Sequence, residues 1–338
     1  MYHTEEKDIL LCYIVNAQGK CIHPKERFIK SAGYIKNGKV TDHMFDSFLF
    51  LCSPNYLYNY FPGGYALKEL TKADWERYIA EEEFAEGTAI KALDAAVGEV
   101  KETIGDPDYQ ANVFMSLFYP VSTVRSFGEV DGKDLDLSKV ENCQAALRWM
   151  VDESIVQFEA QNFKNVRLAG FYWYCEELNV TDVDMGLTSY ITAYVREKGL
   201  KTCWCPFFGA PGHERWKELG FDIATEQANY FPEHHKTLPN RGTAERLPLV
   251  AADVEKYGHG VGMEMVSPDA MSAAVFKEYF KAGIEYGFMH KPHIYYMGAG
   301  PINVEVIADS EDAYLRSTYD ELYKYIHRTL TVEDIKFE

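Results

Sequence analysis

The sequence predicts an α/β fold, a (β/α)8 barrel in which eight parallel strands alternate with helices. Three observations indicate this fold. Short apolar runs recur along the 338 residues, longer stretches with helical periodicity lie between them, and no glycine-rich phosphate loop follows the first run. The structural alternative, an open doubly wound sheet, usually carries a GxGxxG or GxxxxGK[ST] pattern there, and the glycines at 63–64 and 298–300 match neither. Since eight alternating strands favour closure, we expect a TIM barrel with long βα loops.

The expected strands are short apolar runs bounded by polar or turn-forming residues. They are residues 8–15, 45–52, 112–119, 166–174, 201–207, 221–228, 259–266 and 293–299. No linker, repeat or low-complexity tract separates these runs, so residues 1–338 are expected to form a single barrel domain. The insertion after the second strand, SPNYLYNYFPGGYALKEL, is rich in tyrosine. It leaves the carboxyl end of that strand, where barrel loops build active sites.

Helical periodicity fills most of the intervals between the expected strands. The expected helices are residues 72–104 (broken near Gly87), 139–163, 182–198, 211–219, 268–286 and 310–328. Several begin with residues that favour helix amino termini, namely Ser138, Thr181 with Asp182, and the Ser-Pro-Asp sequence at 267–269.

Composition restricts the class of partner. A net charge of -18 argues against nucleic acid or an anionic membrane surface, because both require clustered Lys and Arg. An aromatic content of 14%, with 24 Tyr and 20 Phe, suits a large core and also a carbohydrate site, where aromatic rings stack on sugar rings. No apolar run reaches the length of a membrane span. The start, MYHTEEKDILLCYIV, lacks the features of a signal peptide, so the chain as given is expected in the cytoplasm, or outside it if a signal was trimmed.

Cysteine and histidine spacing predicts neither a disulfide framework nor a metal-dependent active site. The seven cysteines are odd in number, and most lie within apolar runs, which indicates buried thiols. The close histidines are His234 with His235 and His290 with His293, whereas the first strand lacks the HxH pattern typical of metal-dependent barrel hydrolases. We therefore expect no zinc or iron site and no cofactor.

The fourth expected strand carries a candidate catalytic carboxylate at its end. Successive side chains of a strand point to opposite faces, and Phe171 suits the layer against the helices. Tyr172, Tyr174 and Glu176 would then face the barrel axis, and Glu177 would point away if the strand continued that far.

The seventh expected strand carries the second candidate. Met263 and Met265 suit the helix layer, so Gly260, Gly262 and Glu264 should face the axis. Glu264 would lie above two glycines that leave room for a ligand.

Two inward carboxylates at the ends of strands four and seven fit glycoside hydrolysis. Taken singly, Glu176 and Glu264 are ordinary loop carboxylates; together they match an acid/base and a nucleophile. The acid must keep its proton near neutrality, and the aromatic neighbours of Glu176 would raise its pKa by desolvation. Retention requires carboxyl groups about 5–5.5 Å apart and inversion about 6.5–9.5 Å. We prefer a retaining mechanism with Glu176 as acid/base and Glu264 as nucleophile.

Other polar and aromatic residues near strand ends are expected to bind the substrate, an oligosaccharide or polysaccharide. Amides suit sugar hydroxyls, which both donate and accept hydrogen bonds, and aromatic rings offer stacking faces. The expected substrate-binding residues are Tyr172, Tyr174, Trp204, Gln227, Asn229, Tyr230, Tyr56 and Arg125. Asn229 could equally belong to a polar cluster that stabilises the loop, an alternative that fits Gln227 less well, and Trp204 could belong to the core. Arg241 is a weaker candidate for an acidic substrate, and Glu226, on the opposite strand face, is a reserve carboxylate.

Two stretches carry a family resemblance. LAGFYWYCEE, and then CWCPFFGAPGHERWKELGFDIATEQANYF, resemble the bacterial family catalogued as domain of unknown function 4855, most specifically over residues 168–231. In that family a proline often stands where this chain has Ala228. The resemblance implies a glycosidase-type TIM barrel and glycoside hydrolase activity. It also implies that Glu176 or Glu177 is the strand-four carboxylate and that Gln227 and Asn229 line the site. It supplies no substrate.

Two other functions remain open from the sequence. One is a non-catalytic carbohydrate-binding barrel, in which the aromatic residues bind sugars and the glutamates accept hydrogen bonds from hydroxyls. The other is a different barrel hydrolase or lyase that uses Glu226, Gln227 and tyrosine side chains as acid/base groups. The glycan, the linkage, exo or endo action and the oligomeric state are not predicted.

Overall fold

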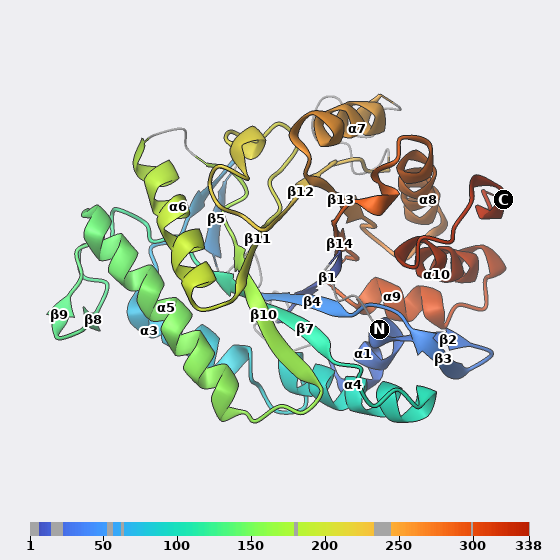
Figure 1. Ribbon diagram of the computed structural model, residues 1–338, viewed down its shortest axis with the longest axis horizontal. Coiled ribbons are helices and arrows are strands. Elements are labelled where there is room, and N and C mark those ends of the chain that lie inside the picture. The colour runs from blue at the N-terminus through green and yellow to red at the C-terminus, as the bar shows by residue number, and fades with distance from the viewer. Residues whose placement is uncertain are drawn as a thin grey trace.

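The computed structural model describes residues 7–14, 23–52, 57–61, 64–178, 182–232, 245–298 and 300–337. Eight parallel strands form a closed barrel in the order β1-β14-β13-β12-β11-β10-β7-β4, and helices surround it (Figure 1). The α/β barrel expected from the sequence is confirmed.

Every expected strand is present, and each lies within one residue of the expected range or inside it. The barrel strands are β1 (Asp8–Tyr13), β4 (Ser47–Leu51), β7 (Ala111–Leu117), β10 (Val166–Trp173), β11 (Lys201–Trp204), β12 (Ile223–Gln227), β13 (Gly260–Glu264) and β14 (His293–Tyr296). Counted along the barrel strands, β10 is therefore the fourth and β13 the seventh, as the sequence predicts.

The helices cover the outside of the barrel. They are α1 (Lys25–Ala32), α3 (Lys72–Arg77), α4 (Ala89–Ile104), α5 (Val140–Ala160), α6 (Asp182–Glu197), α7 (Arg246–Tyr257), α8 (Ala270–Glu285), α9 (Ile302–Ala308) and α10 (Ala313–Ile326). Shorter turns are the π-helical η1 (Tyr78–Glu82) and the 3-10 turns η2 (His213–Arg215), η4 (Phe288–His290) and η5 (Val332–Asp334). Three small hairpins pair β2 (Gly33–Lys36) with β3 (Lys39–His43), β5 (Tyr58–Phe61) with β6 (Gly64–Leu67), and β8 (Glu129–Val130) with β9 (Lys133–Asp134). No helix within the described ranges has both the length and the apolar character needed to cross a membrane.

The prediction of a helix at residues 211–219 is wrong. That stretch contains only the 3-10 turn η2, flanked by Gly212 and Gly220 in left-handed conformations with φ of +86° and +88°. Left-handed residues end helices, so these glycines bound the segment, and the residues between them form turns. Helices α1, α7 and α9 are present in addition to the helices expected from the sequence.

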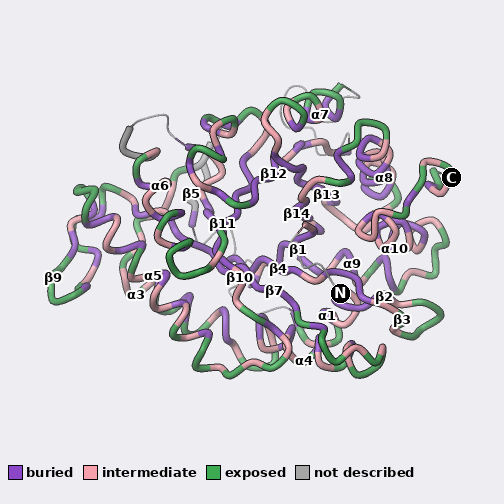
Figure 2. The backbone as a smooth tube through the Cα atoms, viewed as in Figure 1, coloured by how far each residue is buried: buried purple, intermediate pink, exposed green. Residues whose placement is uncertain are grey.

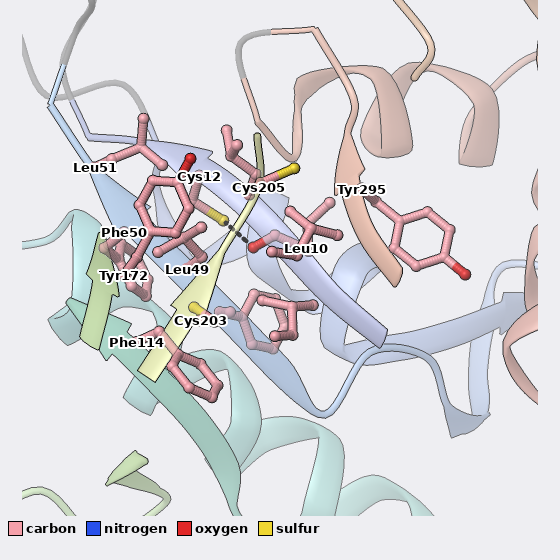
Figure 3. Packing of buried hydrophobic residues seen from close by; sticks show 14 of the residues in the cluster. Leu10, Cys12, Leu49, Phe50, Leu51, Phe114, Tyr172, Cys203, Cys205 and Tyr295 are labelled. Carbon is pink, nitrogen blue, oxygen red and sulfur yellow. Dashed lines mark hydrogen bonds between the residues drawn. The ribbon is translucent and has the colours of Figure 1, made fainter. Parts of the chain in front are cut away.

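Burial follows the barrel, with buried strands at the centre and exposed segments on the outer helices (Figure 2). Figure 3 shows core side chains from β1, β4, β7, β10, β11 and β14 packed together, with Cys12 Sγ donating to the Leu10 carbonyl oxygen at 3.5 Å. The described cysteines carry free thiols, as expected: Cys12, Cys52, Cys143, Cys175, Cys203 and Cys205.

The two glycines below Glu264 have different roles. Gly262 lines the cavity at the barrel mouth, as expected. At Gly260, a Cβ atom would lie 1.8 Å from the carbonyl oxygen of Pro292, which immediately precedes β14. The expectation that both glycines make room for a ligand is therefore wrong for Gly260, because the close approach of the neighbouring backbone requires that glycine.

Candidate active site

A cavity of about 820 Å³ opens where the strands of the barrel end. Its lining comes from all the barrel strands except β7, or from the residues just after them. The lining residues are Leu11, Tyr13, Leu51, Tyr172, Tyr174, Glu176, Glu177, Cys205, Phe207, Gln227, Asn229, Phe231, Gly262, Glu264, Val266, Ile294 and Tyr296. The two carboxylates expected to be catalytic therefore line one cavity, at the barrel end where such folds place their sites.

Glu264 is held firmly at the end of β13. Its side chain is only 5% exposed. The backbone N–H of Asn229 donates to Oε2 at 2.6 Å, and the hydroxyl of Tyr279, on α8, donates to the same oxygen at 3.1 Å. Burial, and then the charge of Glu264, raise the pKa of Tyr279 well above its ordinary value, so this phenol remains a donor. Two donors on one oxygen suit an ionised carboxylate with a fixed orientation.

Asn229 directs its backbone N–H at Glu264 through an uncommon conformation. Its φ is +49°, in the left-handed region that Asn tolerates better than most residues. The side-chain Oδ1 accepts from the N–H of Phe208 at 3.4 Å, and Nδ2 donates to Gln227 Oε1 at 3.3 Å. Gln227 Nε2 in turn donates to the Cys205 carbonyl oxygen at 2.9 Å. Both expected amides line the cavity, and their hydrogen bonds also brace the segment after β11.

This geometry predicts different outcomes for two substitutions at Asn229. Asn229→Gly keeps the left-handed conformation and the N–H that faces Glu264, whereas Asn229→Ala places a Cβ in that conformation. We expect the alanine variant to be about 1 kcal/mol less stable than the glycine variant in urea unfolding. Equal stabilities, or a more stable alanine variant, would show that the left-handed backbone at this position is not required.

Glu176 and Glu177 both line the cavity and are partly exposed. Strand β10 ends at Trp173, so the alternation of side chains no longer applies at these two residues. The condition under which Glu177 would point away from the axis, a strand that continues to this residue, is therefore not met. Burial, followed by the charges of Glu176 and Glu264 among others, raises the pKa of the Cys205 thiol, which places both carboxylates in the electrostatic environment of one buried side chain.

Tyrosines form much of the cavity wall. Tyr172 and Tyr174 lie there as expected, with ring centroids 6.1 Å apart and planes at 71°. Tyr13 and Tyr296, which the sequence reading missed, meet edge to face at 6.3 Å. Both are the last residues of their strands, and this position at the carboxyl end of a barrel strand could have identified them as cavity residues. It was overlooked because aromatic residues in an apolar run are read as core.

Three residues expected to bind substrate lie elsewhere. Trp204 is fully buried on the outer face of β11, stacked on Phe221 at 5.1 Å, because alternation turns Cys205 and not Trp204 toward the cavity. Tyr230 packs beside Tyr279 at 5.9 Å and is not among the lining residues. Arg125 is 66% exposed and pairs with Asp136 at 3.3 Å, also away from the lining.

Several other residues singled out in the sequence can also be placed. Tyr56, Arg241, His234 and His235 lie outside the described residues. His293 is buried at the amino end of β14, opposite the cavity, and His290 is exposed. Glu226 is completely buried on the outer face of β12, behind the cavity wall, and accepts a hydrogen bond from the N–H of Gly209 at 2.8 Å.

The solved structures that are similar to this chain come from proteins described with different functions. They include the catalytic domain of a family GH18 chitinase from the fern Peteris ryukyuensis, with 13% identity, a TM-score of 0.42, and coverage of 94% of this chain and 99% of that chain. The endo-beta-1,4-glucanase Xac0029 from Xanthomonas axonopodis pv. citri matches with 9% identity, a TM-score of 0.43, and coverage of 87% and 88%. The xylanase-alpha-amylase inhibitor protein XAIP-I, in complex with trehalose, matches with 12% identity, a TM-score of 0.43, and coverage of 94% and 98%. Likeness at this level carries no argument about activity.

No curated protein matches the chain. The model of one family matches residues 8–324, which include all eight barrel strands and both candidate carboxylates. The chain therefore belongs to the family described as "Domain of unknown function (DUF4855)".

Proposed function

We propose that the chain is a retaining glycoside hydrolase, with Glu176 as acid/base and Glu264 as nucleophile. One observation carries this proposal: Glu176, which follows the fourth strand, and Glu264, which ends the seventh, line the same cavity at the carboxyl end of the barrel. Hydrolysis by this fold requires a proton donor and a second carboxylate at one site, and these two positions supply both.

The proposed reaction has two steps. Glu264 attacks the anomeric carbon while the glycosidic C–O bond breaks, and Glu176 gives its proton to the departing oxygen. Water then attacks the same carbon, the bond to Glu264 breaks, and Glu176 takes the proton from the water. The firm hold on Glu264 by Asn229 and Tyr279 suits the nucleophile. The greater exposure of Glu176 suits a group that exchanges its proton at each turnover.

The cavity walls support a carbohydrate substrate. Tyrosine and phenylalanine rings, among them Tyr172, Tyr174 and Tyr296, provide faces for pyranose rings and hydroxyls for hydrogen bonds. The volume of about 820 Å³ lies in the range of about 300–1,000 Å³ of typical ligand pockets, which suits an oligosaccharide or the end of a longer chain. Glu226 is buried and does not line this cavity, so its carboxyl group has no access to a substrate bound there. This argues against the alternative in which Glu226 is the catalytic acid or base.

The direct test is hydrolysis of a panel of aryl glycosides and oligosaccharides, with the first-formed anomer identified by ¹H NMR. We expect hydrolysis with retained configuration for at least one sugar. A product of inverted configuration would show that the second carboxylate acts as a general base and not as a nucleophile. Saturable sugar binding without hydrolysis would instead support the non-catalytic carbohydrate-binding barrel.

A further inference from the structure

A second cluster of polar side chains lies outside the barrel, behind the wall of the cavity. It joins His213 of η2, Glu226 of β12 and Asp253 of α7, segments that are separate in the sequence. One candidate ligand atom from each lies within 4.8 Å of the others. His213 Nε2 and Glu226 Oε1 are 3.8 Å apart. The fold has therefore brought one imidazole and two carboxylates to a common point.

Buried polar atoms converge here without partners. The Glu226 side chain is 0% exposed, and its Oε2 has no hydrogen-bond partner among the described residues. His213 Nε2 and His259 Nε2 likewise have none within that part of the chain. Leaving a buried polar atom unsatisfied costs about 1–3 kcal/mol, and more for a charged group. Two such atoms within the cluster, and a third on the neighbouring His259 ring, indicate a site that takes a ligand.

In its neutral form, each of the two histidine rings presents a lone pair at Nε2. His213 Nδ1 lies 2.8 Å from the Ala210 carbonyl oxygen, and His259 Nδ1 lies 2.9 Å from the Gly260 carbonyl oxygen. A carbonyl oxygen only accepts, so Nδ1 carries the proton in each ring and the neutral Nε2 is a lone-pair donor. Histidines that bind metals are oriented in this way by a backbone carbonyl or a carboxylate.

The cluster contains two acidic side chains, and a basic one, Arg246, lies nearby. Burial, and then the charge of Asp253, raise the pKa of Glu226 to about 7, and Arg246 opposes this shift. The guanidinium carbon of Arg246 lies 4.0 Å from the centre of the Phe208 ring. Two neighbouring carboxyl groups and an imidazole form a donor set of the kind that binds a divalent ion.

We propose that His213, Glu226 and Asp253 bind a divalent transition-metal ion of the zinc type. Zinc accepts imidazole nitrogen and carboxylate oxygen at about 2.0–2.2 Å, with three or four protein ligands in a tetrahedral arrangement. Atoms within 4.8 Å of one another reach this geometry after small side-chain movements. His259, whose ring centroid is 6.1 Å from that of His213, is the nearby fourth donor.

The proposed ion has a structural role, independent of the proposed hydrolysis. It would tie η2 and α7 to β12, and η2 belongs to the segment that begins with Cys205 and Phe207 in the cavity wall. Phe207 forms an isolated parallel β-bridge with Gln227 through the backbone. The ion would therefore stabilise this wall from behind.

The test uses the full chain after chelation and dialysis, titrated with ZnCl₂. Bound zinc is counted by elemental analysis, affinity is measured by calorimetry, and the site is probed by Co²⁺ absorption and by the shift in Tm. We expect one tightly bound ion per chain, an intense visible Co²⁺ band typical of tetrahedral sites, and a higher Tm. His213→Gln and Asp253→Asn should each weaken binding by more than about 100-fold, since even an outer partner of a ligand contributes about 10- to 100-fold.

Two matched controls should keep wild-type affinity. Glu255→Gln removes an exposed carboxylate two residues from Asp253 on the same helix. The double variant His234→Gln/His235→Gln removes adjacent histidines that could bind zinc on their own. Asp253 is partly exposed, so Asp253→Asn is expected to fold, which far-UV circular dichroism checks. Wild-type protein that binds no zinc, or an Asp253→Asn variant that folds and binds as wild type does, overturns the proposal.

Discussion

Glu264→Gln is expected to lower kcat for glycoside hydrolysis by about 10³-fold or more, because an amide cannot attack the anomeric carbon. The substitution preserves the shape of a side chain that is 5% exposed and accepts two hydrogen bonds, so the fold should survive. The measurement is kcat and KM on the best aryl glycoside of the panel, with urea unfolding to confirm folding. Glu285→Gln, at the exposed end of α8, is the matched control and should retain full activity.

A rescue experiment separates a nucleophile from a residue that only positions others. Glu264→Ala leaves space beside the anomeric carbon, and added azide can attack that carbon while the aryloxide leaves. The product should be a glycosyl azide of inverted configuration, because the enzymic nucleophile no longer takes part. Wild-type kcat in Glu264→Gln would rule out the assigned role. Loss of activity without rescue by azide would assign Glu264 to binding.

The barrel could be predicted because its signal is local. Each strand is a compact apolar run, and closure follows from the number and regular alternation of the runs. The errors come from places where local pattern and tertiary packing disagree. Residues 211–219 have helical periodicity, yet Gly212 and Gly220 are left-handed and restrict the helix to one 3-10 turn. Gly260 was expected to leave room for a ligand. Glycine is required there because the carbonyl oxygen of Pro292, 32 residues further along the chain, leaves no space for a Cβ atom.

The candidate site was only partly predictable for the same reason. Strand alternation correctly places Glu264 above Gly262, because both lie within β13. The prediction is wrong for Trp204. Its position near the end of β11 suggested that it lines the cavity, but its side chain lies on the outer face of the strand. The cluster of His213, Glu226 and Asp253 has no sequence signal, because its members come from three elements and follow no ligand spacing.

Glu176→Gln is expected to cause the second-largest loss of hydrolytic rate, and the size of this loss should depend on the leaving group. Without a proton donor, oligosaccharides and alkyl glycosides should be cleaved about 10²–10⁴-fold more slowly. Aryl glycosides with acidic phenols should lose much less in the first step, because such phenolates leave without protonation. The alkaline fall of the wild-type rate-pH profile reports loss of the acid's proton, so this fall should disappear in the variant.

Glu177→Gln is the decisive comparison, because the adjacent carboxylate lines the same cavity and has similar exposure. If Glu176 is the acid/base, Glu177→Gln should keep the wild-type dependence on leaving group and the alkaline limb of the pH profile. The opposite pattern would transfer the role to Glu177 and leave the two-carboxylate mechanism intact. Unchanged kinetics in both variants would contradict that mechanism, because no acid would then follow the fourth strand. The steep dependence on leaving group, rather than loss of rate alone, therefore identifies which of the two neighbouring glutamates donates the proton.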